Sequence, residues 1–300
     1  MLSPQAQAFE NALRALSDNV IEGEPTLEDQ REAAAAFGAM TAEPAGVTYT
    51  ETEIAGRRAQ WIEPEGAATD RVLLYVHGGG YVLCSLETHA KLVGHLCKAI
   101  GCRGLNFDYR LAPEHPHPAA VEDSTAAYRA LLDMGIEPGH IAIAGDSAGG
   151  GLTVATLLKL RDEGDPMPAA GVPLSPWADL EGLGESMTSN AASDLLVQQE
   201  GLKGMSDMFL NGQDARDPLA APLYASYEGL APMYIQVGGA ETLLDDSTRV
   251  AARAARAGVE VRLDVFPGMQ HVFQMAAGNV PEADDAVARI GDWLRPKLGL

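Results

Sequence analysis

A serine between two glycines stands where a strand-like segment meets a helix-like one, in IAIAGDSAGGG at residues 141–151. The apolar run before Gly145 predicts a buried strand, and the segment from Ala148 predicts a helix. A strand, a sharp turn at Ser147 and a helix are the context of a nucleophile elbow, in which the serine hydroxyl projects above the sheet. A GxSxG match alone arises by chance in many sequences, but these flanks favour Ser147 as a nucleophile. Glycines at 145 and 149 suit the turn, because neighbouring backbone crowds it.

A second glycine-rich segment, VHGGGY at residues 76–81, directly follows the strand-like run RVLLYV. Acyl transfer needs N–H donors aimed at an oxygen that becomes negatively charged, and consecutive glycines let the backbone approach that oxygen closely. We predict that Gly78 and Gly79 donate to it, together with the N–H of Ala148 at the start of the helix after Ser147. A phosphate-binding loop is the alternative, but the segment matches neither GxGxxG nor GxxxxGK[ST].

The segments around these motifs predict one α/β domain that spans residues 1–300. From about residue 47 the chain alternates strand-like and helix-like segments, and a short turn at Ala55-Gly56 joins the first two strands as a hairpin. Helices of this length between strands imply right-handed crossovers and a mostly parallel central sheet with helices on both faces. Active sites on such sheets lie beyond the carboxyl ends of the strands.

Two segments do not fit this alternation. Residues 1–45 are predicted to be helical and to precede the sheet, with a second helix beginning at Thr26. Residues 178–222, approximately, form a glycine-punctuated amphipathic insertion, and long insertions outside a sheet are usually functional. We expect the two segments to form a helical cap over the site.

The chain resembles the bacterial hormone-sensitive-lipase family (family IV) of carboxylesterases, which has the α/β-hydrolase fold. The resemblance covers most of the chain and rests on HGGGY (77–81), DYRLAPEHPHPAAVED (108–123), GDSAGG (145–150), PLSPW (173–177) and PGMQHVF (267–273). It implies a carboxylesterase with a helical cap that hydrolyses short- to medium-chain acyl esters. Such an enzyme needs no metal or organic cofactor.

His271 is the predicted general base, because it follows the strand-like run VEVRLDVF and the order serine, acid, histidine is that of the α/β hydrolases. Glu241 is the predicted acid, since the strand PMYIQV ends near Val237 and places Glu241 just beyond the sheet. Asp245 is the alternative acid. Asp245 and Asp246 lie in the first turn of the next helix, where carboxylates interact favourably with free amides and the helix dipole. The family mostly has aspartate in a D-x-L-x-D pattern here, with glutamate in a minority of members.

Composition restricts the partners and the compartment. The net charge is −21, with 42 acidic and 21 basic residues, which argues against binding to nucleic acid or an anionic membrane. No segment has the roughly 18 consecutive apolar residues of a membrane span. The first residues lack the features of a signal peptide, and three cysteines without framework spacing predict free thiols. We therefore expect a cytoplasmic protein that acts on a small-molecule ester.

Several alternatives remain open at this level. An amidase or a lactonase would use the same triad, and a non-catalytic ligand-binding member, like the plant gibberellin receptors, would lack the triad histidine. Among the histidines, His115 and His117 are the only pair that suggests a metal site. The adjacent prolines instead indicate a rigid turn, and no carboxylate or cysteine cluster completes a site. The final strand could be a sheet edge that pairs in a homodimer.

Overall fold

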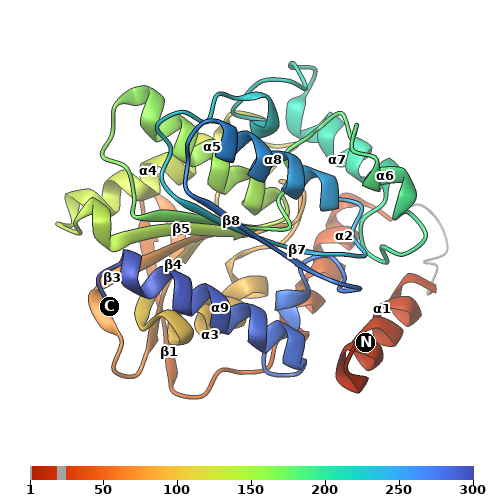
Figure 1. The fold of residues 1–300 in the computed structure, drawn as a ribbon, viewed down its shortest axis with the longest axis horizontal. Coiled ribbons are helices and arrows are strands. Elements are labelled where there is room, and N and C mark those ends of the chain that lie inside the picture. The colour runs from red at the N-terminus through yellow and green to blue at the C-terminus, as the bar shows by residue number, and fades with distance from the viewer. Residues whose placement is uncertain (1, 19–24) are drawn as a thin grey trace.

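The computed structural model describes residues 2–18 and 25–300 (Figure 1). The predicted cap segment 1–45 therefore includes residues 1 and 19–24, which lie outside the described part. One sheet of eight strands runs in the order β1-β2-β4-β3-β5-β6-β7-β8. The strands are β1 Val47–Ile54, β2 Arg57–Pro64, β3 Ala68–Val76, β4 Cys102–Phe107, β5 Ile141–Asp146, β6 Ala170–Leu174, β7 Met233–Gly238 and β8 Val261–Phe266. Among the strands of the described residues, the β1–β2 and β2–β4 pairs are antiparallel and the other pairs are parallel, which confirms the mostly parallel sheet.

Helices cover both faces of the sheet, as predicted (Figure 1). The α-helices are α1 Pro4–Asp18, α2 Leu27–Ala34, α3 Leu86–Ile100, α4 Ala119–Asp133, α5 Ala148–Glu163, α6 Ser186–Ser189, α7 Gln199–Leu210, α8 Leu244–Arg256 and α9 Pro281–Lys297. Short 3-10 helices are η1 Ala35–Ala39, η2 Pro138–His140, η3 Pro222–Tyr224 and η4 Phe273–Ala276. Helices α4, α5 and α8 lie on one face, and α3 and α9 lie on the other. Within the described ranges, no helix is both long and apolar enough to cross a membrane.

Local signals account for the ends of several elements. Ala55 and Gly56 both have positive φ angles, 48° and 73°, which suits a tight hairpin turn between β1 and β2. Helix α3 ends at Gly101 with φ 84°, a left-handed conformation that glycine adopts without steric cost. The predicted start of the second helix is confirmed, because Thr26 caps α2 in a reciprocal pair of hydrogen bonds with Asp29.

Strand β6 was not predicted from the sequence. It has five residues, AGVPL, and includes Gly171 and Pro173, which are both unfavourable in strand interiors. Tertiary context decides its conformation, because the strand lies fully buried between β5 and β7. Its position matters for the site, since β5 precedes Ser147, β7 precedes Glu241, and the residue after β6 is Ser175.

Two sets of hydrogen bonds show how the N-terminal segment is attached to the body. Ser3 donates through its N–H and its hydroxyl to the two carboxylate oxygens of Glu282 on α9, both at 2.7 Å. On α2, Arg31 donates to the carbonyl oxygens of Val82 at 2.9 Å and Ala112 at 3.0 Å. The Ser3 contacts hold the start of the segment against α9, and the Arg31 contacts hold α2 against the loops that carry Val82 and Ala112.

Candidate active site

Ser147 lies at a strained turn between β5 and α5. Its φ of 55° and ψ of −121° fall outside the favoured regions for a residue with a side chain. A Cβ atom at Gly145 would lie 2.4 Å from the carbonyl oxygen of Val76, and one at Gly149 would lie 2.0 Å from the same oxygen. Both contacts are shorter than van der Waals packing allows, so the two glycines permit the close packing of this turn against the end of β3.

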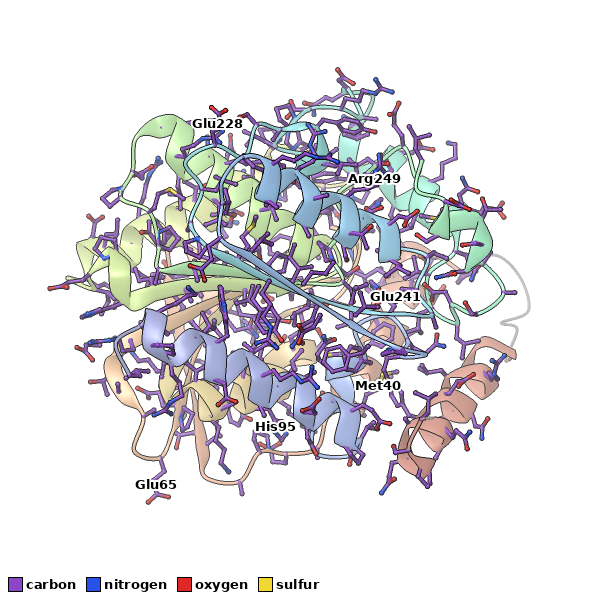
Figure 2. The ribbon with its side chains drawn as sticks, in the orientation of Figure 1. Met40, Glu65, His95, Glu228, Glu241 and Arg249 are labelled. Atoms are coloured by element: carbon purple, nitrogen blue, oxygen red, sulfur yellow. The ribbon has the colours of Figure 1, made fainter. Side chains whose placement is uncertain are left out.

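Glu241 and His271 meet at the carboxyl edge of the sheet. Glu241 follows β7, His271 follows β8, and His271 Nδ1 lies 2.8 Å from Glu241 Oε2. Figure 2 shows Glu241 beyond the end of β7, at the end of the molecule where α6 lies. The other oxygen of Glu241 accepts hydrogen bonds from the Ser175 hydroxyl at 2.7 Å and from the N–H of Gly238. The carboxylate is thus fixed on one side and directed at the imidazole on the other.

Burial and charge act against each other in this pair. Burial opposes the charged imidazole, but attraction to the Glu241 carboxylate and the hydrogen bond with it outweigh burial and raise the pKa of His271. Burial raises the pKa of Glu241, while His271, Ser175 and the N–H of Gly238 act in the opposite direction. The environment therefore favours a histidine that can take up and hold a proton.

The neighbouring aspartates serve another purpose. Asp245 accepts a hydrogen bond from the N–H of Ser186 at 3.0 Å, and Asp246 accepts from the N–H groups of Ala178 at 2.8 Å and Asp179 at 2.9 Å. Both lie in the first turn of α8, as predicted, but they bind backbone amides of the insertion and not those of their own helix. Burial raises the pKa of Asp246 to about 7. Neither aspartate is hydrogen-bonded to His271 in the described part of the chain.

In the glycine-rich turn, one of the predicted donors is engaged in another hydrogen bond. The N–H of Gly78 donates to Asp146 Oδ1 at 3.1 Å, and a Cβ at Gly78 would lie 2.2 Å from Asp146 Oδ2. Gly78 therefore packs beneath the turn, and its N–H is not free for a substrate. Gly79 and Gly80, with φ of 106° and 62°, line the pocket instead. Gly80 was not among the predicted donors, although it is the third glycine of the run. Ala148 begins α5, as predicted.

One pocket of about 270 Å³ contains these groups. Ser147, His271, Gly79 and Gly80 all line it. The Ser147 hydroxyl and the His271 imidazole face the same cavity without a direct hydrogen bond between them, and such contacts often tighten only when substrate binds. The arrangement can place an acyl carbon between a nucleophile and a proton acceptor.

Both segments that interrupt the sheet contribute walls to this pocket. These walls are apolar: Phe9, Phe37 and Met40 come from the N-terminal segment, and Leu196, Leu202 and Met205 come from the insertion. Helix α7 packs closely on the glycine-rich turn, since a Cβ at Gly80 would lie 2.1 Å from the sulfur of Met205. The pocket therefore suits an apolar group beside the reactive serine.

No metal centre is formed by the residues that the structure describes. Groups of three or more histidine, cysteine or carboxylate side chains with suitable geometry are absent from residues 2–18 and 25–300. Cys84, Cys97 and Cys102 are free thiols.

Comparisons with known proteins define the class and then the family. Residues 73–275 match the model of a protein family that is described as having the α/β-hydrolase fold. It is similar to an acetyl-hydrolase from Streptomyces hygroscopicus, with 44% identity over 241 residues that cover 80% of each chain. It is also similar to an esterase from Acinetobacter venetianus, with 37% identity over 80% of this chain and 79% of the relative. The chain is an α/β hydrolase.

Solved structures identify the family within the α/β hydrolases. The crystal structure of an esterase from the bacterial hormone-sensitive lipase family is 44% identical and superimposes with a TM-score of 0.95 over 100% of both chains. A hormone-sensitive lipase from a metagenome library is 40% identical, with a TM-score of 0.93 over 98% of each chain. The chain belongs to the bacterial hormone-sensitive-lipase family of serine carboxylic ester hydrolases.

Proposed function

We propose that this protein is a carboxylesterase that hydrolyses short- to medium-chain acyl esters through Ser147, His271, Glu241 and an acyl-enzyme. The observation that carries the proposal is the 2.8 Å contact between His271 Nδ1 and Glu241 Oε2, with His271 lining the same pocket as Ser147. Glu241 holds the proton on Nδ1, so Nε2 is the nitrogen that can accept a proton from the serine hydroxyl.

Acylation follows from these positions. Ser147 Oγ attacks the ester carbonyl carbon while His271 Nε2 takes the hydroxyl proton, and Glu241 stabilises the resulting imidazolium. The carbonyl oxygen becomes an oxyanion, for which we propose the N–H groups of Gly79, Gly80 and Ala148 as donors. Each donor of this kind contributes on the order of 100- to 1,000-fold to kcat.

Deacylation uses the same groups in reverse. Acylation first ends when the tetrahedral intermediate breaks its bond to the alcohol oxygen, which takes the proton from His271, and the acyl group remains bonded to Ser147. Water enters the vacated space, His271 removes its proton, and the hydroxide attacks the acyl carbon. The tetrahedral intermediate expels the serine oxygen, which regains its proton from the imidazole.

The N-terminal segment and the insertion act, in this proposal, as a cap that encloses the acyl chain. The support is the apolar wall that both segments contribute to a pocket of about 270 Å³. A cavity of this size accommodates a short acyl chain beside the serine, and a long chain would have to displace side chains such as Met205.

The decisive assay is the rate of p-nitrophenyl ester hydrolysis from acetyl to palmitoyl, with Ser147→Ala as the blank. We expect a Ser147-dependent maximum at short acyl chains, because longer chains exceed the pocket. A maximum at palmitoyl would contradict the proposed substrate class, and absence of Ser147-dependent hydrolysis at every length would favour a non-catalytic ligand-binding protein.

An amidase or a lactonase with the same triad is the second candidate function. The same triad geometry serves ester, amide and lactone hydrolysis, so the three activities are distinguished by the leaving group of the preferred substrate. Parallel assays of matched acyl p-nitrophenyl esters and acyl p-nitroanilides, together with a γ-lactone, separate them. Faster turnover of the anilide or the lactone than of the ester would replace the proposed activity.

We also propose a homodimer formed through β8, which is the last strand of the sheet. Val265 on this strand is 42% exposed, and no strand among the described residues pairs with the outer edge of β8, so this edge presents unpaired backbone groups. Sedimentation velocity should therefore give a dimer for the natural chain and a monomer for Val265→Lys, because the introduced charges repel across a two-fold contact. A monomeric natural chain at micromolar concentration would contradict this proposal.

A further inference from the structure

The segment of residues 190–198, which joins α6 to α7, lies along the two loops that carry the proposed acid and base. Asn190 Nδ2 donates to the carbonyl oxygen of Glu241 at 2.8 Å. Gln270 Nε2 donates to the carbonyl oxygen of Ser193 at 2.9 Å. The segment thus forms hydrogen bonds with both loops at once. A change in the position of the segment would therefore shift Glu241 and His271.

Asp194 lies at the centre of this segment and is 2% exposed. Its Oδ2 accepts hydrogen bonds from the N–H of Thr242 at 2.8 Å and from the Thr242 hydroxyl at 3.0 Å. Its Oδ1 accepts from the N–H groups of Leu196 at 3.0 Å and Val197 at 2.9 Å. Four donors directed at two oxygens fit an ionised carboxylate, which only accepts. Thr242 directly follows Glu241 in the chain, so Asp194 fixes the loop of the proposed acid.

The charge of Asp194 has no lysine or arginine partner among the described residues. Its negative charge acts on the imidazole of His271. Burial lowers the pKa of His271, and Glu241 raises it most, with smaller contributions of the same sign from Asp194 and Asp146. The three carboxylates that raise the pKa of His271 thus come from the loop after β7, the 190–198 segment and the end of β5.

We propose that Asp194 is a positioning residue of the triad, which holds the Glu241 loop through Thr242 and stabilises the imidazolium of His271 in the transition state. The proposal rests on the proposed function, because it assigns Asp194 a part in that reaction. It makes the insertion a contributor to the rate of the chemical step in addition to a wall of the pocket.

A purely structural role is the competing explanation. A carboxylate that accepts from the N–H groups two and three residues later stabilises a local turn in many proteins. In that case Asp194 would affect folding stability alone. The two explanations differ in the pH dependence of kcat/KM, which a stabilising turn would not change.

The test compares Asp194→Asn with the natural chain in kcat/KM for a short p-nitrophenyl ester against pH. The ascending limb reports the pKa of the free base, which must be neutral to accept the serine proton. Loss of the negative charge destabilises the imidazolium, so we expect the limb to move to lower pH by about 0.5 to 1 pH unit. We expect the plateau to fall by about 10- to 100-fold, because the acid loop also loses an acceptor for the Thr242 N–H.

Two matched variants separate the causes. Thr242→Val removes one hydrogen bond to Asp194 but keeps the charge of Asp194. The ascending limb of the pH profile should therefore stay at the natural pH, and the plateau should fall less than in Asp194→Asn. Asp207→Asn removes one charge from α7 at a side chain that is 67% exposed, so neither its limb nor its plateau should change. If Asp194→Asn fails to fold, Asp194→Ser carries the same test, since its hydroxyl retains an acceptor for the turn.

An unshifted limb for Asp194→Asn, with only a lower Tm, would overturn the proposal. NMR titration of His271 in the same variants measures the shift without any turnover. If the natural chain hydrolyses no ester, the proposed function fails, and the titration still decides whether Asp194 acts on His271.

Discussion

Ser147→Ala is expected to lower kcat for the preferred p-nitrophenyl ester by about 10⁵- to 10⁶-fold, which is the scale at which a nucleophile is lost from a Ser-His-acid triad. The mechanism leaves no substitute for the missing oxygen: without Ser147 Oγ no acyl-enzyme forms, and the remaining rate comes from water attack assisted by the oxyanion donors. The backbone strain at φ 55° is the same for alanine as for serine, so the fold should be retained.

Single-turnover kinetics and circular dichroism check this result together. Ser226→Ala, at an exposed position outside the pocket, is the matched control and should keep the natural rate. Mass spectrometry after exposure to a phosphonate ester should show one adduct on the natural chain and none on Ser147→Ala. Retention of more than about 1% of kcat in Ser147→Ala would require another nucleophile.

Glu241→Gln should lower kcat by about 10³- to 10⁴-fold with little change in KM. The reason is that a neutral amide neither fixes the proton on His271 Nδ1 nor stabilises the imidazolium, which exists only in the transition states and between the two steps. Substrate binding in the pocket does not involve Glu241, whose side chain is fully buried behind the imidazole. The loss should therefore appear in kcat.

Asp245→Asn is the matched control for this prediction, because it removes the neighbouring carboxylate. Asp245 contacts the N–H of Ser186 and not the imidazole, so the variant should keep kcat within a few-fold of the natural value. Steady-state kinetics of the two variants at the same pH decide between the two acids. Natural turnover in Glu241→Gln together with loss of turnover in Asp245→Asn would reverse the assignment.

The parts of the site that the sequence predicted are those with a local signal. GDSAG between a strand and a helix located Ser147 at the turn, and the end of β7 located Glu241 beyond the sheet. Each of these positions follows from the strand that precedes it, and parallel strands bring their carboxyl ends to one edge. The 2.8 Å contact of Glu241 with His271 is a consequence of that shared edge.

The parts that the sequence did not predict depend on contacts between distant segments. The direction of each N–H in a run of three glycines is set by the turn geometry, and Gly78 turned out to bind the carboxylate of Asp146. Strand β6 has no periodic pattern and forms because its neighbours cover it. Asp194 lies 48 residues from Thr242, and nothing in its own neighbourhood marks it as a partner of the acid loop.

The attachment of Ser3 to Glu282 implies an order of events during synthesis of the chain. These residues are 279 positions apart, which corresponds to about 15 to 55 s of translation at typical rates. During that interval helix α1 has no α9 to pack on, and the wall that includes Phe9 is incomplete. A nascent chain therefore contains Ser147, Glu241 and His271 before α9 is present to hold α1, so the pocket wall that includes Phe9 is the last part of the site to form.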